Sequence, residues 1–189
     1  MMNNAKEMDI VMTKWAGMYG TGILAKECEE VLCKRYPRRY IREATKLLDY
    51  RDTNVEIDLI KNEDIVAMHD VSDGGVFGAL WQILKSIGQG GEIWLEKIPI
   101  KQETIEICEF YSLNPYMLQG QGSLLFITYN AKEIIEKLMN KGIISTVIGK
   151  TTDHNDRVVM ISGKARFLVP PKGDELNRVF GKRGAYYAK

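Results

Sequence analysis

Histidine, cysteine and an excess of charge of either sign are all scarce in this sequence. Its 189 residues include two histidines and three cysteines, and its formal net charge at pH 7 is +1. Two histidines argue against a zinc site built on imidazoles, and the near-zero charge argues against a nucleic-acid partner. The odd number of cysteines, without C-x-x-C spacing, predicts a reduced chain in the cytoplasm.

Long apolar runs are absent as well. No stretch approaches the roughly 20 residues that span a bilayer, and the N-terminus lacks the apolar core of a signal peptide, so we expect no membrane partner. A hydrophobic content of 45% and a charged content of 27% are typical of a globular protein. We expect a flexible lead over residues 1–8, one domain over residues 9–181 and a basic tail over residues 182–189.

The most informative segment is His69–Trp81, with the sequence HDVSDGGVFGALW. The apolar run Ile65–Met68 before it predicts a short buried strand. Gly74 and Gly75 predict a tight turn, and an amphipathic helix is expected to begin near Val76. A glycine turn between a strand and a helix is a place where phosphate binds, since the first helical N–H groups point at the anion.

Acidic side chains lie in the same loop. Asp70 and Asp73 would repel a bare phosphate, which favours an intervening divalent cation or water, or a role for Asp73 as helix N-cap. His69 and Asp70 follow a strand, where open α/β sheets place their sites, and they are our candidate catalytic residues. The equal alternative is that His69 bonds to backbone and Asp70 shapes the turn. The candidate phosphate- or ATP-binding residues are Ser72, Asp73, Gly74 and Gly75, and no metal ligand is assigned.

Two further segments are candidate parts of a substrate cleft. Gly17 and Gly20 precede a helical pattern, where they form either a second anion-binding turn or, as we favour, a close packing of backbone against the sheet. Gln121 and Ser123 precede an apolar strand, and their polar groups can face a substrate. A tight turn is the simpler interpretation of that second segment.

Strands and helices alternate along the chain, with one hairpin near its end. This order predicts a mixed sheet with helices packed on it. The predicted strands cover residues 10–12, 92–95, 123–128, 143–148 and the hairpin 158–169, and the clearest predicted helices cover residues 103–111, 131–140 and 174–180.

The ordered set of motifs resembles the C-terminal domain of the AIR synthase-related superfamily, the family of aminoimidazole ribonucleotide synthetase, HypE and selenophosphate synthetase. Met68–Trp81 looks like the glycine-rich loop of that domain, and Asp9–Thr21 looks like its first strand and glycines. Leu113–Pro115, Gly122–Leu125 and Val147–Lys150 follow in the family's order. The resemblance implies an α+β fold, with helices layered on a mixed, largely antiparallel sheet.

The resemblance also implies an activity, that of an ATP-dependent enzyme of the ligase or cyclo-ligase type that uses ATP and Mg²⁺. In the family, ATP lies mainly on an N-terminal domain that this chain lacks, and the C-terminal domain closes over the phosphates with its glycine-rich loop. The expected partners are a nucleotide, a small-molecule substrate, a separate polypeptide carrying the N-terminal domain, and a second copy of the chain. The alternative is a stand-alone, non-catalytic binding or assembly module with exposed apolar surface.

Overall fold

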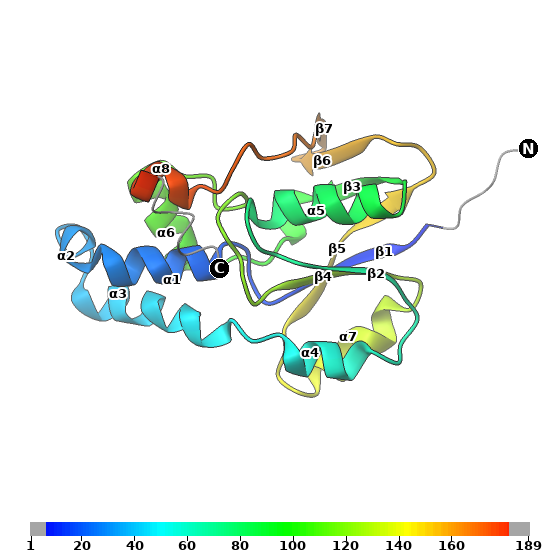
Figure 1. The fold of residues 1–189 in the computed structure, drawn as a ribbon, viewed down its shortest axis with the longest axis horizontal. Coiled ribbons are helices and arrows are strands. Elements are labelled where there is room, and N and C mark those ends of the chain that lie inside the picture. The colour runs from blue at the N-terminus through cyan, green and yellow to red at the C-terminus, as the bar shows by residue number, and fades with distance from the viewer. Residues whose placement is uncertain (1–6, 182–189) are drawn as a thin grey trace, which may run out of the picture.

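Seven strands form one sheet in the computed structural model, which describes residues 7–181 (Figure 1). The strand order is β2-β4-β1-β5-β3-β6-β7. β3 and β6 run parallel, and the other neighbouring pairs run antiparallel. The mixed, largely antiparallel sheet of the predicted α+β fold is therefore confirmed. The strands are β1 (Asp9–Thr13), β2 (Ile65–Asp70), β3 (Gly90–Trp94), β4 (Leu124–Thr128), β5 (Ser145–Thr152), β6 (Arg157–Ile161) and β7 (Lys164–Phe167).

Helices cover both faces of this sheet. Figure 1 shows α5 (Gly75–Ser86) on one face, and α4 (Asn54–Ile60) with α7 (Ala131–Met139) on the other. The remaining helices gather at one end of the sheet: α1 (Met18–Glu27), α2 (Glu29–Leu32), α3 (Arg38–Thr45), α6 (Gln102–Tyr111) and α8 (Leu176–Phe180), with 3₁₀ turns at Lys46–Tyr50 and Leu95–Lys97. Among the helices of residues 7–181, none has both the length and the apolar content to cross a bilayer.

The central strand β4 shows why the sheet needs helices on both sides. All five of its residues are buried. Successive side chains of a strand point to opposite faces, so burial of all five requires cover on both faces. Leu125 and Ile127 pack in the cluster that contains α5, whereas Leu124 and Phe126 pack in the cluster that contains α4 and α7. A continuous apolar strand is typical of a sheet that is covered on both faces.

The prediction of a buried strand over residues 65–68 is wrong about burial. β2 lies at the edge of the sheet and pairs with β4 alone. Its side chains alternate in exposure, and Val66 and Met68 keep 42% and 44% of their surface exposed. The strand nevertheless ends at Asp70, directly before α5, so it delivers His69 and the glycine-rich loop to one edge of the sheet.

Residues 1–6 of the predicted lead and all of the predicted tail, residues 182–189, lie outside the described residues. Met8, which belongs to the predicted lead, is buried. Its N–H donates to Thr151 Oγ1 at 3.0 Å, and the Thr151 N–H donates to the Met8 carbonyl at 2.9 Å. These two bonds extend the packed structure to Met8.

Candidate functional site: a polar cavity at the N-terminus of α5

The turn between β2 and α5 depends on two consecutive glycines. Gly74 and Gly75 have φ angles of +78° and +62°, in the left-handed region that glycine adopts without steric cost. A Cβ on Gly75 would lie 2.6 Å from the carbonyl oxygen of Leu118. Backbone cannot withdraw as a flexible side chain can, so only glycine fits at this position.

The expectation that Asp73 caps α5 is wrong. Its side chain is exposed and makes no capping hydrogen bond, and the residue at the N-cap position is Gly74. The Gly74 N–H instead donates to Oδ2 of Asp174, at 3.0 Å. A carboxylate distant in sequence therefore supplies the acceptor that a local cap supplies in most helices.

Other N–H groups of this turn also have partners inside the protein. The Gly75 N–H donates to the Ser72 carbonyl at 3.0 Å, and the Phe77 N–H donates to the Tyr116 carbonyl at 3.0 Å. The Phe77 and Tyr116 rings also stack, with centroids 5.5 Å apart. The first turn of α5 is thus held by the 114–120 loop as well as by Asp174.

Asp174 is a buried acid, with 5% of its surface exposed. Its Oδ1 accepts the N–H of Leu176 at 2.9 Å, so one carboxylate joins the starts of α5 and α8. Burial raises the pKa of Asp174 to about 6, although the N–H groups of Leu176 and Gly74 act in the opposite direction and the charge of Asp73 adds to the rise. Sequence reasoning missed Asp174, because it lies 100 residues from Gly74.

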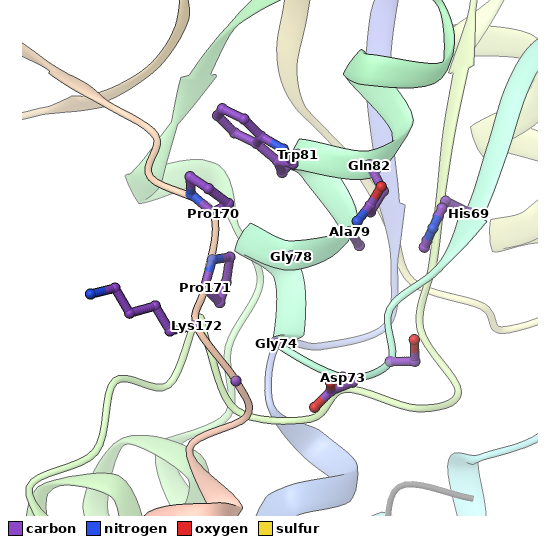
Figure 2. Close-up of a pocket in the computed structure, with 12 residues that line it drawn as sticks. His69, Asp73, Gly74, Gly78, Ala79, Trp81, Gln82, Pro170, Pro171 and Lys172 are labelled. Atoms are coloured by element: carbon purple, nitrogen blue, oxygen red, sulfur yellow. The ribbon is translucent and has the colours of Figure 1, made fainter.

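A cavity of about 410 Å³ opens beside this turn (Figure 2). It brings together His69, Ser72, Asp73 and Gly74, four residues that the sequence singles out for catalysis or phosphate binding. Asp70 and Gly75 are not among its lining residues. The full lining is His69, Ser72, Asp73, Gly74, Gly78, Ala79, Trp81, Gln82, Pro170, Pro171, Lys172 and Gly173.

One ring nitrogen of His69, Nδ1, makes a hydrogen bond to the backbone, and Nε2 takes no part in that bond. Nδ1 lies 2.7 Å from the backbone oxygen of Asp70. A carbonyl oxygen only accepts, so Nδ1 carries the hydrogen, and in the neutral ring Nε2 is then an acceptor. The two alternatives for His69 are compatible, since it bonds to backbone and also lines the cavity. Asp70 contributes its carbonyl to this arrangement, while its side chain is exposed.

One wall of the cavity comes from the segment Val169–Gly173, which we call the strap. Before it, the Leu168 N–H donates to the Arg157 carbonyl at 2.8 Å, and after it comes the Asp174 carboxylate. Within residues 7–181, no hydrogen bond joins the strap itself to another segment. Pro171 packs on the glycine-rich loop, where a Cβ on Gly74 would lie 3.3 Å from its ring. Figure 2 shows the strap prolines on one side of the first turn of α5 and His69 on the other.

The cavity carries charge of both signs. Lys172 and Asp73 are both exposed, and in Figure 2 the Lys172 side chain extends away from Asp73 and His69. Across the described part of the chain, Lys172 forms no ion pair. A free ammonium group on a flexible side chain is available to an anionic ligand.

The predicted substrate-cleft residues lie elsewhere. Gly17 and Gly20 are buried, and a Cβ on Gly20 would lie 2.5 Å from Cγ of Leu118. Close packing is therefore the reason for these glycines, but their partner is the 114–120 loop rather than the sheet. Ser123 is fully buried and donates to the Trp15 carbonyl at 2.9 Å. Gln121 is half-buried, and its Oε1 has no hydrogen-bond partner among the described residues.

The three cysteines do not line the cavity. Cys28, Cys33 and Cys108 are free thiols, and burial raises the pKa of Cys108 to about 12, which makes it a poor nucleophile. In residues 7–181, no group of three or more His, Cys, Asp or Glu side chains is placed to hold a metal ion.

The sequence model for the C-terminal domain of AIR synthase related proteins matches residues 10–162. The chain belongs to this family. The match spans every strand except β7 and contains the whole glycine-rich loop, but it ends before the strap and Asp174.

Curated relatives match over part of their length. The chain is 27% identical over 122 residues to carbamoyl dehydratase HypE of Rhodobacter capsulatus, covering 61% of this chain and 36% of that protein. It is 27% identical over 121 residues to phosphoribosylformylglycinamidine synthase subunit PurL of Caldanaerobacter subterraneus, covering 61% of this chain and 15% of that protein.

Solved structures share the fold over most of the chain. HypE of E. coli, a hydrogenase maturation protein, superposes with a TM-score of 0.73 at 19% identity, covering 91% of this chain and 52% of that one. A HypE solved in complex with ATP superposes with a TM-score of 0.62 at 16% identity, covering 86% and 50%. The chain therefore spans about half of the length of these proteins.

Proposed function

We propose that this domain forms one wall of an ATP-dependent active site and that its glycine-rich loop faces the phosphates of the nucleotide. The observation that carries the proposal is the single cavity that unites His69, Ser72, Asp73 and Gly74. Membership of the family and a HypE relative that holds ATP support the choice of ligand. The other wall would come from an N-terminal domain of the family's type, and the complete site would carry out ligase- or cyclo-ligase-type chemistry.

The polar groups of the cavity suit a phosphate-bearing ligand. The Ser72 hydroxyl is a donor, and the Lys172 ammonium adds a positive charge that reaches outward from the strap. The exposed Asp73 carboxylate repels a bare phosphate, so the magnesium complex of the nucleotide is the better ligand. The described residues do not make a magnesium site by themselves, and the remaining ligands would come from the nucleotide and the second wall.

His69 is the proposed catalytic residue of this wall. Its Nδ1 hydrogen is fixed on the Asp70 carbonyl, which leaves Nε2 as the atom that accepts a proton from a bound substrate. Asp70 acts through this carbonyl as a positioning residue. The predicted catalytic pair is therefore kept, with different roles for its two members.

A calorimetric titration with ATP, with and without Mg²⁺ and with and without the polypeptide that carries an N-terminal domain, tests the proposal. Ser72→Ala removes a donor from the cavity and should weaken binding about tenfold. Ser86→Ala is the matched control, because the Ser86 hydroxyl bonds to the Ile83 carbonyl at the other end of α5. If the wild-type chain binds no nucleotide under any of these conditions, the proposal is wrong.

A second candidate function is a non-catalytic binding module. An apolar groove of about 390 Å³ lies between Phe77, Met117 and the β6–β7 hairpin, and Phe167 at its rim is 72% exposed. Exposed apolar surface of this kind favours a site for a partner. Sedimentation of the chain alone tests this second candidate, since a binding module with an exposed apolar groove predicts self-association that does not depend on nucleotide. A strictly monomeric chain would count against it.

A further inference from the structure

The anion-binding position of the glycine-rich loop already holds an anion. Helix N-termini favour negative charge, because their N–H groups and the helix dipole both point toward it. At α5 this charge belongs to Asp174, whose Oδ2 lies 3.0 Å from the Gly74 nitrogen. A phosphate approaching the same N–H from the cavity meets a carboxylate in its place.

The same carboxylate holds down a wall of the cavity. The strap is fixed at one end by the bond from Leu168 to Arg157 and at the other by Asp174, with no hydrogen bond of its own between these points within the described residues. Pro170 and Pro171 have fixed φ angles and no N–H groups, so the middle of the strap is stiff, whereas Gly173 allows a bend at its end. Release of the Asp174 side chain would therefore let residues 169–173 move between Leu168 and Glu175, whose N–H still donates to the Met117 carbonyl at 3.3 Å.

The surroundings of Asp174 make its ionised form easy to displace. Burial disfavours the charge, and Asp73 on the glycine-rich loop adds repulsion. Glu175 follows it in the chain, and the buried Cys108 thiol of α6 lies close enough to sense both charges. The backbone N–H groups of Gly74 and Leu176, together with a backbone contact from Gln119, keep the carboxylate in place.

We propose that Asp174 competes with a ligand phosphate for the Gly74 N–H, so that the strap is closed while the carboxylate is bound there and lifts when a phosphate displaces it. The proposal rests on the proposed function and adds a regulatory contact within that site. The ligand class is a phosphate ester or a pyrophosphate. Displacement moves the Asp174 charge toward water while its place at the helix N-terminus passes to the ligand.

Asp174→Asn is the direct test, because it removes the charge and leaves one accepting oxygen, which can serve the N–H of Gly74 or of Leu176 but not both. We expect about tenfold tighter binding of MgATP and of inorganic pyrophosphate at pH 7.5, measured by calorimetry. Glu175→Gln is the matched control, since that buried neighbour accepts the Asn114 N–H and pairs with Arg178 rather than bonding to Gly74. Its affinity should equal that of the wild type.

Limited trypsin digestion measures how accessible the strap is, because Lys172 is exposed within it and trypsin cleaves after lysine. We expect Asp174→Asn to accelerate cleavage after Lys172, and pyrophosphate to accelerate it in the wild type, with fragments identified by mass spectrometry. If Asp174→Asn fails to fold, the wild-type digestion with and without pyrophosphate decides by itself.

The outcomes separate this inference from the proposed function. Weaker or unchanged binding by Asp174→Asn, or protection of Lys172 by pyrophosphate, would overturn the competition and leave the nucleotide site standing. A complete lack of binding by both the wild type and Asp174→Asn would overturn the nucleotide site, and the competition with it.

Discussion

Two segments of this chain share one sequence pattern, a strand followed by glycines and a helix, yet they do different things. The first connects β1 to α1 through Gly17, and the second connects β2 to α5 through Gly74. Both N-cap glycines are left-handed, at φ +62° and +78°. The second segment borders a polar cavity, whereas the first is buried in the molecule.

The difference lies in what surrounds each helix start. At α1, the Thr21 hydroxyl donates to the Gly17 carbonyl at 2.8 Å and lies 3.0 Å from the Thr104 hydroxyl, all of it buried. At α5, the polar partner is a carboxylate carried by a strap that also borders the cavity. The comparison teaches that glycines before a helix permit close approach, and that tertiary packing decides whether the approaching group is protein or ligand.

The largest expected effect is on the stability of the second segment. Gly75→Ala places a Cβ against backbone at 2.6 Å and forces a left-handed alanine, so we expect a loss of more than about 3 kcal/mol in the free energy of unfolding. Gly88→Ala is the control, since Gly88 has φ +66° with no atom within 4 Å of the added Cβ, and should cost about 1 kcal/mol. Urea denaturation measures both. Equal losses would show that the loop shifts freely.

The next effect concerns pH. Asp174 has a pKa raised from 3.8 to about 6 in the folded state. Between these values the unfolded chain releases its proton first, so wild-type stability falls as pH rises and the fall is complete above about pH 7. Relative to Asp174→Asn, the wild type should lose about 2.4 kcal/mol between pH 4 and pH 7 in urea denaturation. If the difference in free energy of unfolding between the wild type and Asp174→Asn stays constant from pH 4 to pH 7, Asp174 does not have a raised pKa.

A smaller effect is expected at the first segment. Gly20→Ala puts a Cβ 2.5 Å from Cγ of Leu118, a side chain that can partly shift, so about 2 kcal/mol should be lost. Nucleotide affinity should not change, because Gly20 lies outside the cavity. If a folded Gly20→Ala protein loses nucleotide affinity, Gly20 belongs to the ligand site after all.

The smallest effect distinguishes contact with the strap from backbone strain. Gly74→Ala and Gly88→Ala share the strain of a left-handed alanine, but only the first meets Pro171, at 3.3 Å. We expect Gly74→Ala to cost about 0.5 kcal/mol more than Gly88→Ala in thermal or urea unfolding. A difference of zero would show that the strap yields without resistance.

Local patterns were enough to predict most elements and part of the site. Ile10–Met12, the helix after Gly75 and the hairpin near the chain end are as predicted, because their apolar periods and glycines reflect local geometry. The strand over residues 65–68 was predicted as buried because its apolar residues are consecutive. Nothing local shows that it lies at a sheet edge.

The cavity likewise contains residues that local patterns predict and residues that they do not. His69, Ser72, Asp73 and Gly74 were selected together, since they follow one another along a strand-to-helix connection. Trp81, Lys172 and Asp174 were not selected as site residues. The last two come from a segment about 100 residues further on, and no local pattern links it to the loop.

By itself, the sequence determined that a strand, a tight glycine turn and a helix would form around His69–Trp81, because turn preference and side-chain period are local properties. Only the tertiary structure decided that Asp174 would accept the Gly74 N–H, that the strap would close one side of the cavity, and that Gly17 and Gly20 would pack against the 114–120 loop rather than the sheet. The physical reason is that a helix N-terminus takes any well-placed anion, and the fold determines which group occupies it.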